Sequence, residues 1–170
     1  MTRTILRVTA LALATAAAPA ALAAEGTDQG FYAGLIAGNN SVDVSGADVD
    51  DGTSIGLLLG YRLAANVGIE LATGNSEHDF PAVPACTMEI DTIGVYGAFR
   101  SAGSAYFKGK LGFLSEDVSA DCVGMTASDS GMSYGLGGGI RVGGNGAVEL
   151  EYTQIEADVS RLSLTALYNF

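Results

Sequence analysis

The sequence has few of the residues on which most binding and catalytic chemistry depends. Among its 170 residues there are one histidine and two cysteines, and tryptophan is absent. Two cysteines without clustered histidines make a poor zinc site. Only 8 lysines and arginines face 19 aspartates and glutamates, and the resulting formal charge of −11 argues against nucleic acid as a partner. We expect no cofactor.

Long apolar runs are also missing, except at the amino terminus. There Arg3 and Arg7 precede the apolar residues 8–18, and Ala21-Leu22-Ala23-Ala24 comes just before Glu25. This order is typical of a secretory signal peptide, and the run is shorter than the roughly 18 to 20 residues of a transmembrane helix. We predict a cleaved signal peptide over residues 1–24 and one domain over residues 25–170, whose charge is −13 once the two arginines are lost from −11.

Because the rest of the chain has no helix-length apolar run, a mature protein in the membrane would have to span it as a closed barrel. All 24 glycines lie in the mature part, where the only prolines are Pro81 and Pro84. Glycine is costly inside helices. It suits tight turns and the crowded interior of a narrow barrel.

The last ten residues alternate between apolar and polar side chains, and only Leu167 breaks the pattern. Period-two alternation puts one set on each side of a strand. An edge strand of a soluble sandwich would show the same pattern. We favour a strand of a membrane barrel, and the secretory signal at the other end of the chain adds to that preference. The apolar set is Leu162, Leu164, Ala166, Tyr168 and Phe170.

Eight segments of about ten residues alternate in this way, and this is the length that a tilted membrane strand needs. They are separated alternately by tight turns and by connections that are mostly longer, which is typical of outer-membrane barrels with the short turns in the periplasm. We predict an all-β fold, an eight-stranded antiparallel up-and-down transmembrane β-barrel with both termini periplasmic. The segments are 31–40, 53–63, 67–79, 88–100, 105–117, 131–142, 147–156 and 161–170.

The longer connections, among them residues 41–52 and 119–130, are rich in aspartate and glutamate. The run Asp48-Val49-Asp50-Asp51-Gly52 has carboxylates suited to Ca²⁺, but it lacks the spacing and terminal glutamate of a calcium loop. We interpret it as a solvated acidic loop. Whether these loops bind Ca²⁺ or an extracellular ligand is left open.

Charged residues at the inward positions of the predicted strands carry both signs, so they can pair across the lumen. Such a network is either a gate for a narrow selective path or a polar plug. We favour the plug, because an eight-stranded barrel is just wide enough for its own side chains. The residues are Arg62, Glu70, Arg100, Lys108, Lys110, Arg141, Glu149 and Glu151.

Cys86 precedes the predicted strand 88–100, and Cys122 follows the strand 105–117. Folding this hairpin about the turn at residues 101–104 brings the two cysteines close together at the loop end. Because an exported protein meets an oxidising compartment, we expect a disulfide. A redox or metal role has less support.

The chain resembles the small eight-stranded outer-membrane proteins, a broad family that includes the OmpA transmembrane domain and related porin-like barrels. The resemblance rests on residues 31–38 (FYAGLIAG), 60–62 (GYR), 148–152 (VELEY) and 167–170 (LYNF). It implies an integral protein of the cell outer membrane in contact with lipid. It also implies that the apolar set ending at Phe170 is the signal read by the outer-membrane assembly machinery.

None of these segments is a catalytic motif, so we expect no enzyme activity. The functional hypothesis is a monomeric barrel with a structural or surface-interaction role and at most weak solute passage. One alternative is a small porin-like diffusion pore. Another is a lipid-modifying enzyme, since some outer-membrane lipid hydrolases use a Ser-His-acid set. His78 has Glu77 and Asp79 as neighbours, but successive strand residues point to opposite faces, so a solvated rim histidine is the simpler interpretation.

Overall fold

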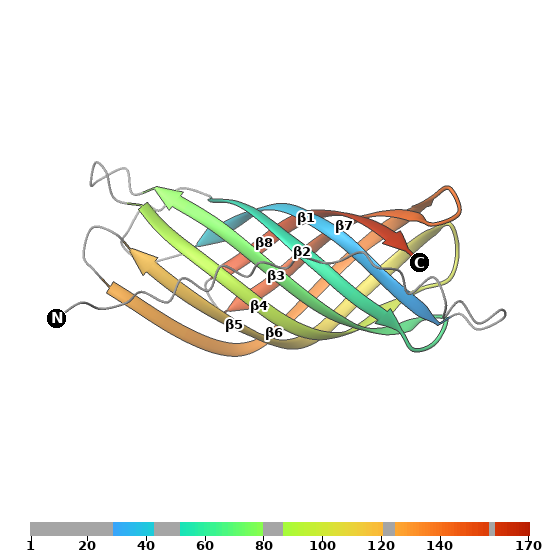
Figure 1. The fold of residues 1–170 in the computed structure, drawn as a ribbon, viewed down its shortest axis with the longest axis horizontal. Coiled ribbons are helices and arrows are strands. Elements are labelled where there is room, and N and C mark those ends of the chain that lie inside the picture. Colours follow the sequence, from blue (N-terminus) through green and yellow to red (C-terminus); the bar gives the residue numbers. More distant parts are fainter. Residues whose placement is uncertain (1–28, 43–51, 80–86, 121–124, 157–158) are drawn as a thin grey trace.

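A computed structural model describes residues 29–42, 52–79, 87–120, 125–156 and 159–170. These residues form eight strands that close into one antiparallel barrel, each strand pairing with its neighbours in the chain and β1 with β8 (Figure 1). The predicted fold is confirmed. The strands are β1 (Gly30–Val42), β2 (Gly52–Arg62), β3 (Val67–Asp79), β4 (Thr87–Arg100), β5 (Ala105–Ala120), β6 (Met125–Val142), β7 (Gly146–Glu156) and β8 (Val159–Asn169).

The inner and outer faces of the barrel differ in exposure, as the alternation predicts. Residues 52–60 of β2, for example, are buried and exposed in strict turn. The outward set of the barrel is apolar and exposed, with Leu57, Leu111, Phe113 and Leu164 between 46% and 71% exposed. Because an apolar patch of this extent is rare on a soluble protein, the outer face suits the hydrocarbon of a bilayer. Within the described part of the chain, helices long and apolar enough to cross a membrane are not found.

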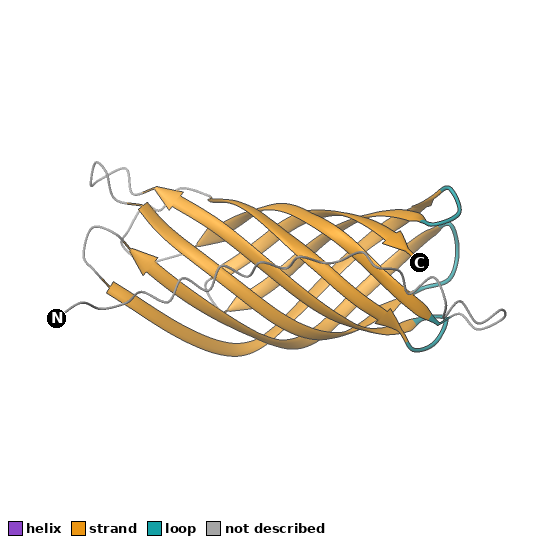
Figure 2. Ribbon diagram, in the orientation of Figure 1, coloured by secondary structure: helices purple, strands orange, loops and turns teal. Residues whose placement is uncertain are grey.

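The three described turns, at residues 63–66, 101–104 and 143–145, lie at the same end of the barrel as the carboxyl terminus, and Figure 2 shows them in teal. Two of them contain a glycine in the left-handed region, Gly103 at φ 114° and Gly143 at φ 65°. Other residues rarely adopt this conformation. We call this end of the barrel the turn end and the opposite end the loop end.

The prediction of a connection over residues 119–130 is wrong. β5 continues to Ala120, and β6 begins at Met125 instead of Gly131, so most of this segment is a paired extension of the β5–β6 hairpin. The alternation missed it because residues 126–130 are exposed on both faces of the sheet. No apolar set marks the strand there. The other strand ends differ from the prediction by at most two residues.

Inside the barrel, large side chains lie opposite glycines. A Cβ atom added to any of these glycines would overlap its large partner, so each pair fills the lumen only because one member has no side chain. The break in the alternation at Leu167 has this explanation, since Leu167 points inward over Gly34 of β1. The cross-strand pairs are Tyr32–Gly60, Tyr96–Gly112, Tyr106–Gly139 and Leu167–Gly34.

Candidate functional site

The candidate functional site is a group of six charged side chains inside the barrel, towards the turn end, which we call the lumenal ion cluster. The group contains three cations and three carboxylates, so its formal charge is zero. Because inward positions repeat every second residue, β5 and β7 each contribute two members. The members are Glu70 of β3, Arg100 of β4, Lys108 and Lys110 of β5, and Glu149 and Glu151 of β7.

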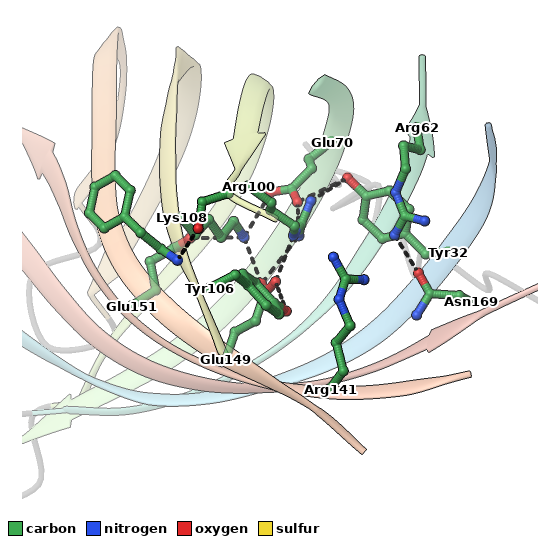
Figure 3. Close-up of polar contacts among 12 residues, drawn as sticks. Tyr32, Arg62, Glu70, Arg100, Tyr106, Lys108, Arg141, Glu149, Glu151 and Asn169 are labelled. Carbon is green, nitrogen blue, oxygen red and sulfur yellow. Dashed lines mark hydrogen bonds and ion pairs between the residues drawn. The ribbon is translucent and has the colours of Figure 1, made fainter. Parts of the chain in front are cut away.

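Arg100 and Lys108 lie at the centre of the cluster (Figure 3). Arg100 binds Glu70 on one side and Glu149 on the other, with its Nε 2.7 Å from the Glu149 Oε1. The Lys108 ammonium lies 3.1 Å from Glu70, 2.9 Å from Glu149 and 2.9 Å from Glu151. Lys108 is 1% exposed and Glu70 and Glu149 are fully buried. Each central cation is therefore shared between carboxylates of strands that are not neighbours.

Lys110 extends the cluster towards the loop end. Its ammonium lies 2.6 Å from Glu151 and 4.3 Å from the centre of the Tyr96 ring, at a distance suited to a cation–π contact. Glu151 also accepts a hydrogen bond from the Thr153 hydroxyl at 2.9 Å. The ion pair and the hydrogen bond together offset the free energy that it costs to remove the Glu151 carboxylate from water.

Two tyrosines connect the cluster to the turn end. The Tyr106 hydroxyl donates to Glu149 at 2.7 Å, and the Tyr32 hydroxyl donates to Glu70 at 3.0 Å. Tyr32 also accepts a hydrogen bond from Arg100 at 3.0 Å. These rings occupy space opposite glycines, so the lumen at this level is filled by side chains that bond to one another.

Two of the eight predicted lumenal residues lie at the turn end, outside the cluster. The Arg62 guanidinium donates to the Asn169 side chain at 2.7 Å, which links β2 to β8. Arg141 is exposed, donates to the Gly103 carbonyl at 3.0 Å and lies 5.1 Å from the centre of the Tyr106 ring. The structure therefore brings six of the eight together and places the other two at the mouth.

Two further charged residues lie in the lumen, on the loop side of the cluster, and were not predicted from the sequence. Arg161 of β8 is 3% exposed and Glu116 of β5 is 8% exposed. The signal was present, because Arg161 alternates with Leu162 and Glu116 has the same parity as Lys110.

Other candidate residues lie wholly or partly outside the described part of the structure. Cys86 and Cys122 are outside it, as are Asp48, Asp50 and Asp51. His78 belongs to β3, but its side chain is not described. Among the residues that are described, no three histidine, cysteine, aspartate or glutamate side chains are grouped to hold a metal ion.

The apolar set at the carboxyl end faces outward along β8, as its alternation predicts. Leu162, Leu164 and Tyr168 are each more than half exposed. The Phe170 ring packs edge-on against Tyr168 at 5.2 Å, and its backbone N–H donates to the Phe31 carbonyl at 3.0 Å. The last residue thus contributes to the β1–β8 seam that closes the barrel.

Comparison with known proteins agrees with this architecture. A family model described as the outer membrane protein beta-barrel domain matches residues 8–170. Neisserial surface protein A is 14% identical with a TM-score of 0.64 over 85% of this chain and 98% of its own. Ail, the attachment invasion locus protein of Yersinia pestis, is 18% identical with a TM-score of 0.58 over 84% and 97%.

The N-terminal barrel of OprF from Pseudomonas aeruginosa is 15% identical, with a TM-score of 0.51 over 82% of this chain and 97% of its own. At these identities the likeness establishes the fold alone. Curated protein sequences give no match.

Proposed function

The chain belongs to the outer membrane protein beta-barrel domain family, and from this membership we propose that it is a non-enzymatic, non-conducting barrel whose role is structural or lies in surface interaction. It is an integral protein of the outer membrane. The proposal adds that its lumen is closed, that its turn end faces the periplasm and that its loop end faces the outside.

The lumenal ion cluster is the observation that carries the proposal of a closed lumen. Its six side chains are all at most 8% exposed and each lies within 3.1 Å of a member of opposite charge. An open pore needs a continuous path of water, whereas here buried side chains that pair with one another occupy the lumen. An eight-stranded barrel is also narrow enough to be filled by side chains.

Solute release from vesicles tests the closed lumen. Purified protein should be folded into liposomes that contain a radiolabelled pentose, with a general porin as the positive control. We expect the sugar to stay inside as it does in protein-free liposomes. Release at the rate of the porin control would favour the diffusion-pore alternative.

Labelling of intact cells tests the orientation. In a variant with both native cysteines replaced by serine, Ser130→Cys places a thiol in the β6 extension and Asn145→Cys places one in the β6–β7 turn, and both positions are exposed. A membrane-impermeant maleimide should label only the first on intact cells and both after lysis. The reverse pattern would contradict the proposed orientation.

The enzyme alternative has a separate test. The purified barrel should be incubated with lipid A and with phospholipid, and the products examined by mass spectrometry. We expect no deacylation. Deacylation by the unaltered protein that is lost in His78→Ala would contradict a non-enzymatic role.

A further inference from the structure

Among the described residues, one edge of strand β6 has no neighbouring strand over part of its length. β6 pairs with β5 from Met125 to Ile140, but its ladder with β7 begins only at Tyr134, which lies opposite Gln154. Within the part of the chain that the structure describes, residues 125–133 therefore pair on one side only, with β5. Figure 1 shows the loop ends of β5 and β6 at the lower left of the barrel. A strand edge of this kind is a template for pairing with another chain.

The backbone groups that this edge offers follow from the alternation of an antiparallel ladder, in which successive residues direct their N–H and C=O groups to opposite sides. Arg141 donates its N–H to Ser104, next to β5, and the Asp129 carbonyl accepts from Ser115 of β5. The backbone N–H and C=O groups of odd-numbered β6 residues therefore point towards β5. The backbone N–H and C=O groups of even-numbered residues, among them Thr126 and Ser128, point towards the free edge.

Asp129 covers one position of the edge, because its carboxylate accepts the N–H of Ser130 at 2.7 Å. A side chain that satisfies its neighbour in this way limits where a partner strand can pair. In the described part of the chain, the N–H groups of Thr126 and Ser128 have no such cap. A strand that paired with this edge would therefore form its hydrogen bonds at these two residues.

A cavity of about 260 Å³ lies beside this edge on the outer face of β4, β5 and β6. Asp91 and Asp117 line it and lie directly opposite each other, and Asp117 lies opposite Ser128. Asp91 accepts a hydrogen bond from Asn75 at 3.0 Å, and no cation pairs with either carboxylate among the described salt bridges. Ala127 and Ser128 of β6, both with small side chains, also line this cavity.

From the free edge and the acidic cavity together, we infer that residues 126–130 of β6 are a docking site for an extended, basic peptide segment. The segment adds to the sheet as a further strand, which is a known mode of peptide recognition. A lysine or arginine on its outer face reaches over Ser128 to Asp117 and Asp91. The inference rests on the proposed function in one respect, that the loop end is accessible to partners outside the cell.

Charge decides between this occupant and a second copy of the chain. Two copies pairing through this edge would bring two acidic rims together, since each chain carries a formal charge of −11 and each edge has Asp129 and Asp117 beside it. Like charges held in register across strands are destabilising. A basic segment, in contrast, is attracted to the carboxylates of Asp117 and Asp129 beside this edge.

The test uses the full barrel in lipid nanodiscs and a fluorescent nine-residue peptide of alternating lysine and threonine, with binding measured by anisotropy. Two further peptides carry N-methyl groups on every second residue, one on the lysines and one on the threonines. A strand that adds to an edge uses only alternate N–H groups, so one methylated peptide should lose binding and the other should keep it. Equal binding by both, or no binding by the parent peptide, would overturn the inference.

Variants of the protein provide the second arm. Ser128→Pro removes an N–H on the free side and leaves the β5 ladder intact, because proline is tolerated on an edge. We expect peptide binding to weaken by up to about tenfold, as the loss of one net hydrogen bond predicts. Asp91→Asn with Asp117→Asn should also weaken it about tenfold. The matched control is Glu77→Gln, an exposed carboxylate on the outer face of β3, which should change the affinity less than about twofold.

Folding of each variant is checked by heat-modifiable migration on a gel. If Ser128→Pro does not fold, the methylated peptides on the unaltered protein still decide. Dimers in detergent that Ser128→Pro dissociates, without peptide binding, would overturn the inference in favour of a second copy. Nanodiscs expose both ends of the barrel, so absent peptide binding would refute the docking site and not the proposed orientation. Failure to label Ser130→Cys on intact cells would refute the proposed orientation and not the docking site.

Discussion

Arg100 of β4 grips the carboxylate of Glu149 of β7 with two nitrogens, Nε at 2.7 Å from Oε1 and Nη2 at 3.2 Å from Oε2. β4 and β7 are not neighbours in the sheet, so this pair crosses the lumen. Glu149 also binds Lys108 and Tyr106. The Glu149 carboxylate thus connects three strands, β4, β5 and β7, across the lumen.

Replacing this carboxylate should destabilise the barrel. Glu149→Gln leaves Arg100 and Lys108 with too little negative charge in a buried site, and breaking such a pair typically costs about 3 to 5 kcal/mol. The free energy of unfolding in lipid vesicles, followed by urea titration, measures this loss. Glu77→Gln, at an exposed carboxylate of β3, is the control and should change it by less than about 0.5 kcal/mol.

Removing both partners should cost less than the sum of the two single changes. The double variant Arg100→Met with Glu149→Met takes one cation and one anion from the cluster, which then stays neutral. Residues in one hydrogen-bond network are typically coupled by about 0.5 to 3 kcal/mol. Additive losses would mean that the two side chains stabilise the barrel independently.

The outer face should not accept charge at the level of the hydrocarbon. Leu111 of β5 is 55% exposed on the outer face, and Leu111→Arg should cost about 2 to 4 kcal/mol near the membrane midplane. Ser119→Arg is the matched control, because Ser119 is exposed on the same face of the same strand but nearer the loop end. Unfolding in vesicles of stated thickness measures both. Equal costs would show that the position of the membrane on the barrel is wrong.

The glycines opposite large lumenal side chains should tolerate no side chain of their own. A Cβ at Gly139 would lie 2.6 Å from the Tyr106 hydroxyl, so Gly139→Ala displaces the ring and weakens its bond to Glu149. Overpacking of this kind typically costs about 1 to 3 kcal/mol. Gly131 of the same strand has no heavy atom within 4 Å of its added Cβ, and Gly131→Ala should be neutral. Urea unfolding compares the two variants.

How far the sequence predicts this fold depends on what lies on each side of a strand. Where lipid meets one face and the lumen the other, alternation identified the strand and its parity, as at Leu111 and Lys110. Where water meets both faces, as at residues 126–130, no alternation exists and the strand was missed. Leu167 broke the pattern for a reason that only the β1 register reveals, namely its partner Gly34.

The same contrast applies to the candidate site. Parity along the strands predicted which charges point inward, and six of them do meet. Parity does not give the height at which facing strands align, so Arg62 and Arg141 could not be separated from the cluster by sequence alone. The free edge of β6 could not be predicted either, because it results from the unequal lengths of two ladders.

The cysteines remain a prediction. In the described ladder Met88 lies opposite Ala120. Cys86 comes two residues before Met88, and Cys122 comes two residues after Ala120. Directly opposed residues in antiparallel strands have Cα atoms about 4.5 to 5.5 Å apart, which suits a disulfide. We expect no free thiol when denatured, unreduced protein is treated with a thiol reagent. Two free thiols would contradict the bridge, and reduction should lower the stability by about 3 kcal/mol or less.

The closed lumen is the central claim, and single-channel recording in a planar bilayer tests it most directly. Folded, unaltered protein should produce no current steps above those of the bare membrane, because the lumenal ion cluster occupies the path. Heat-unfolded protein in the same detergent is the control for membrane leaks. Stable, uniform conductance steps that appear only with the folded protein would contradict the account and identify the barrel as a pore.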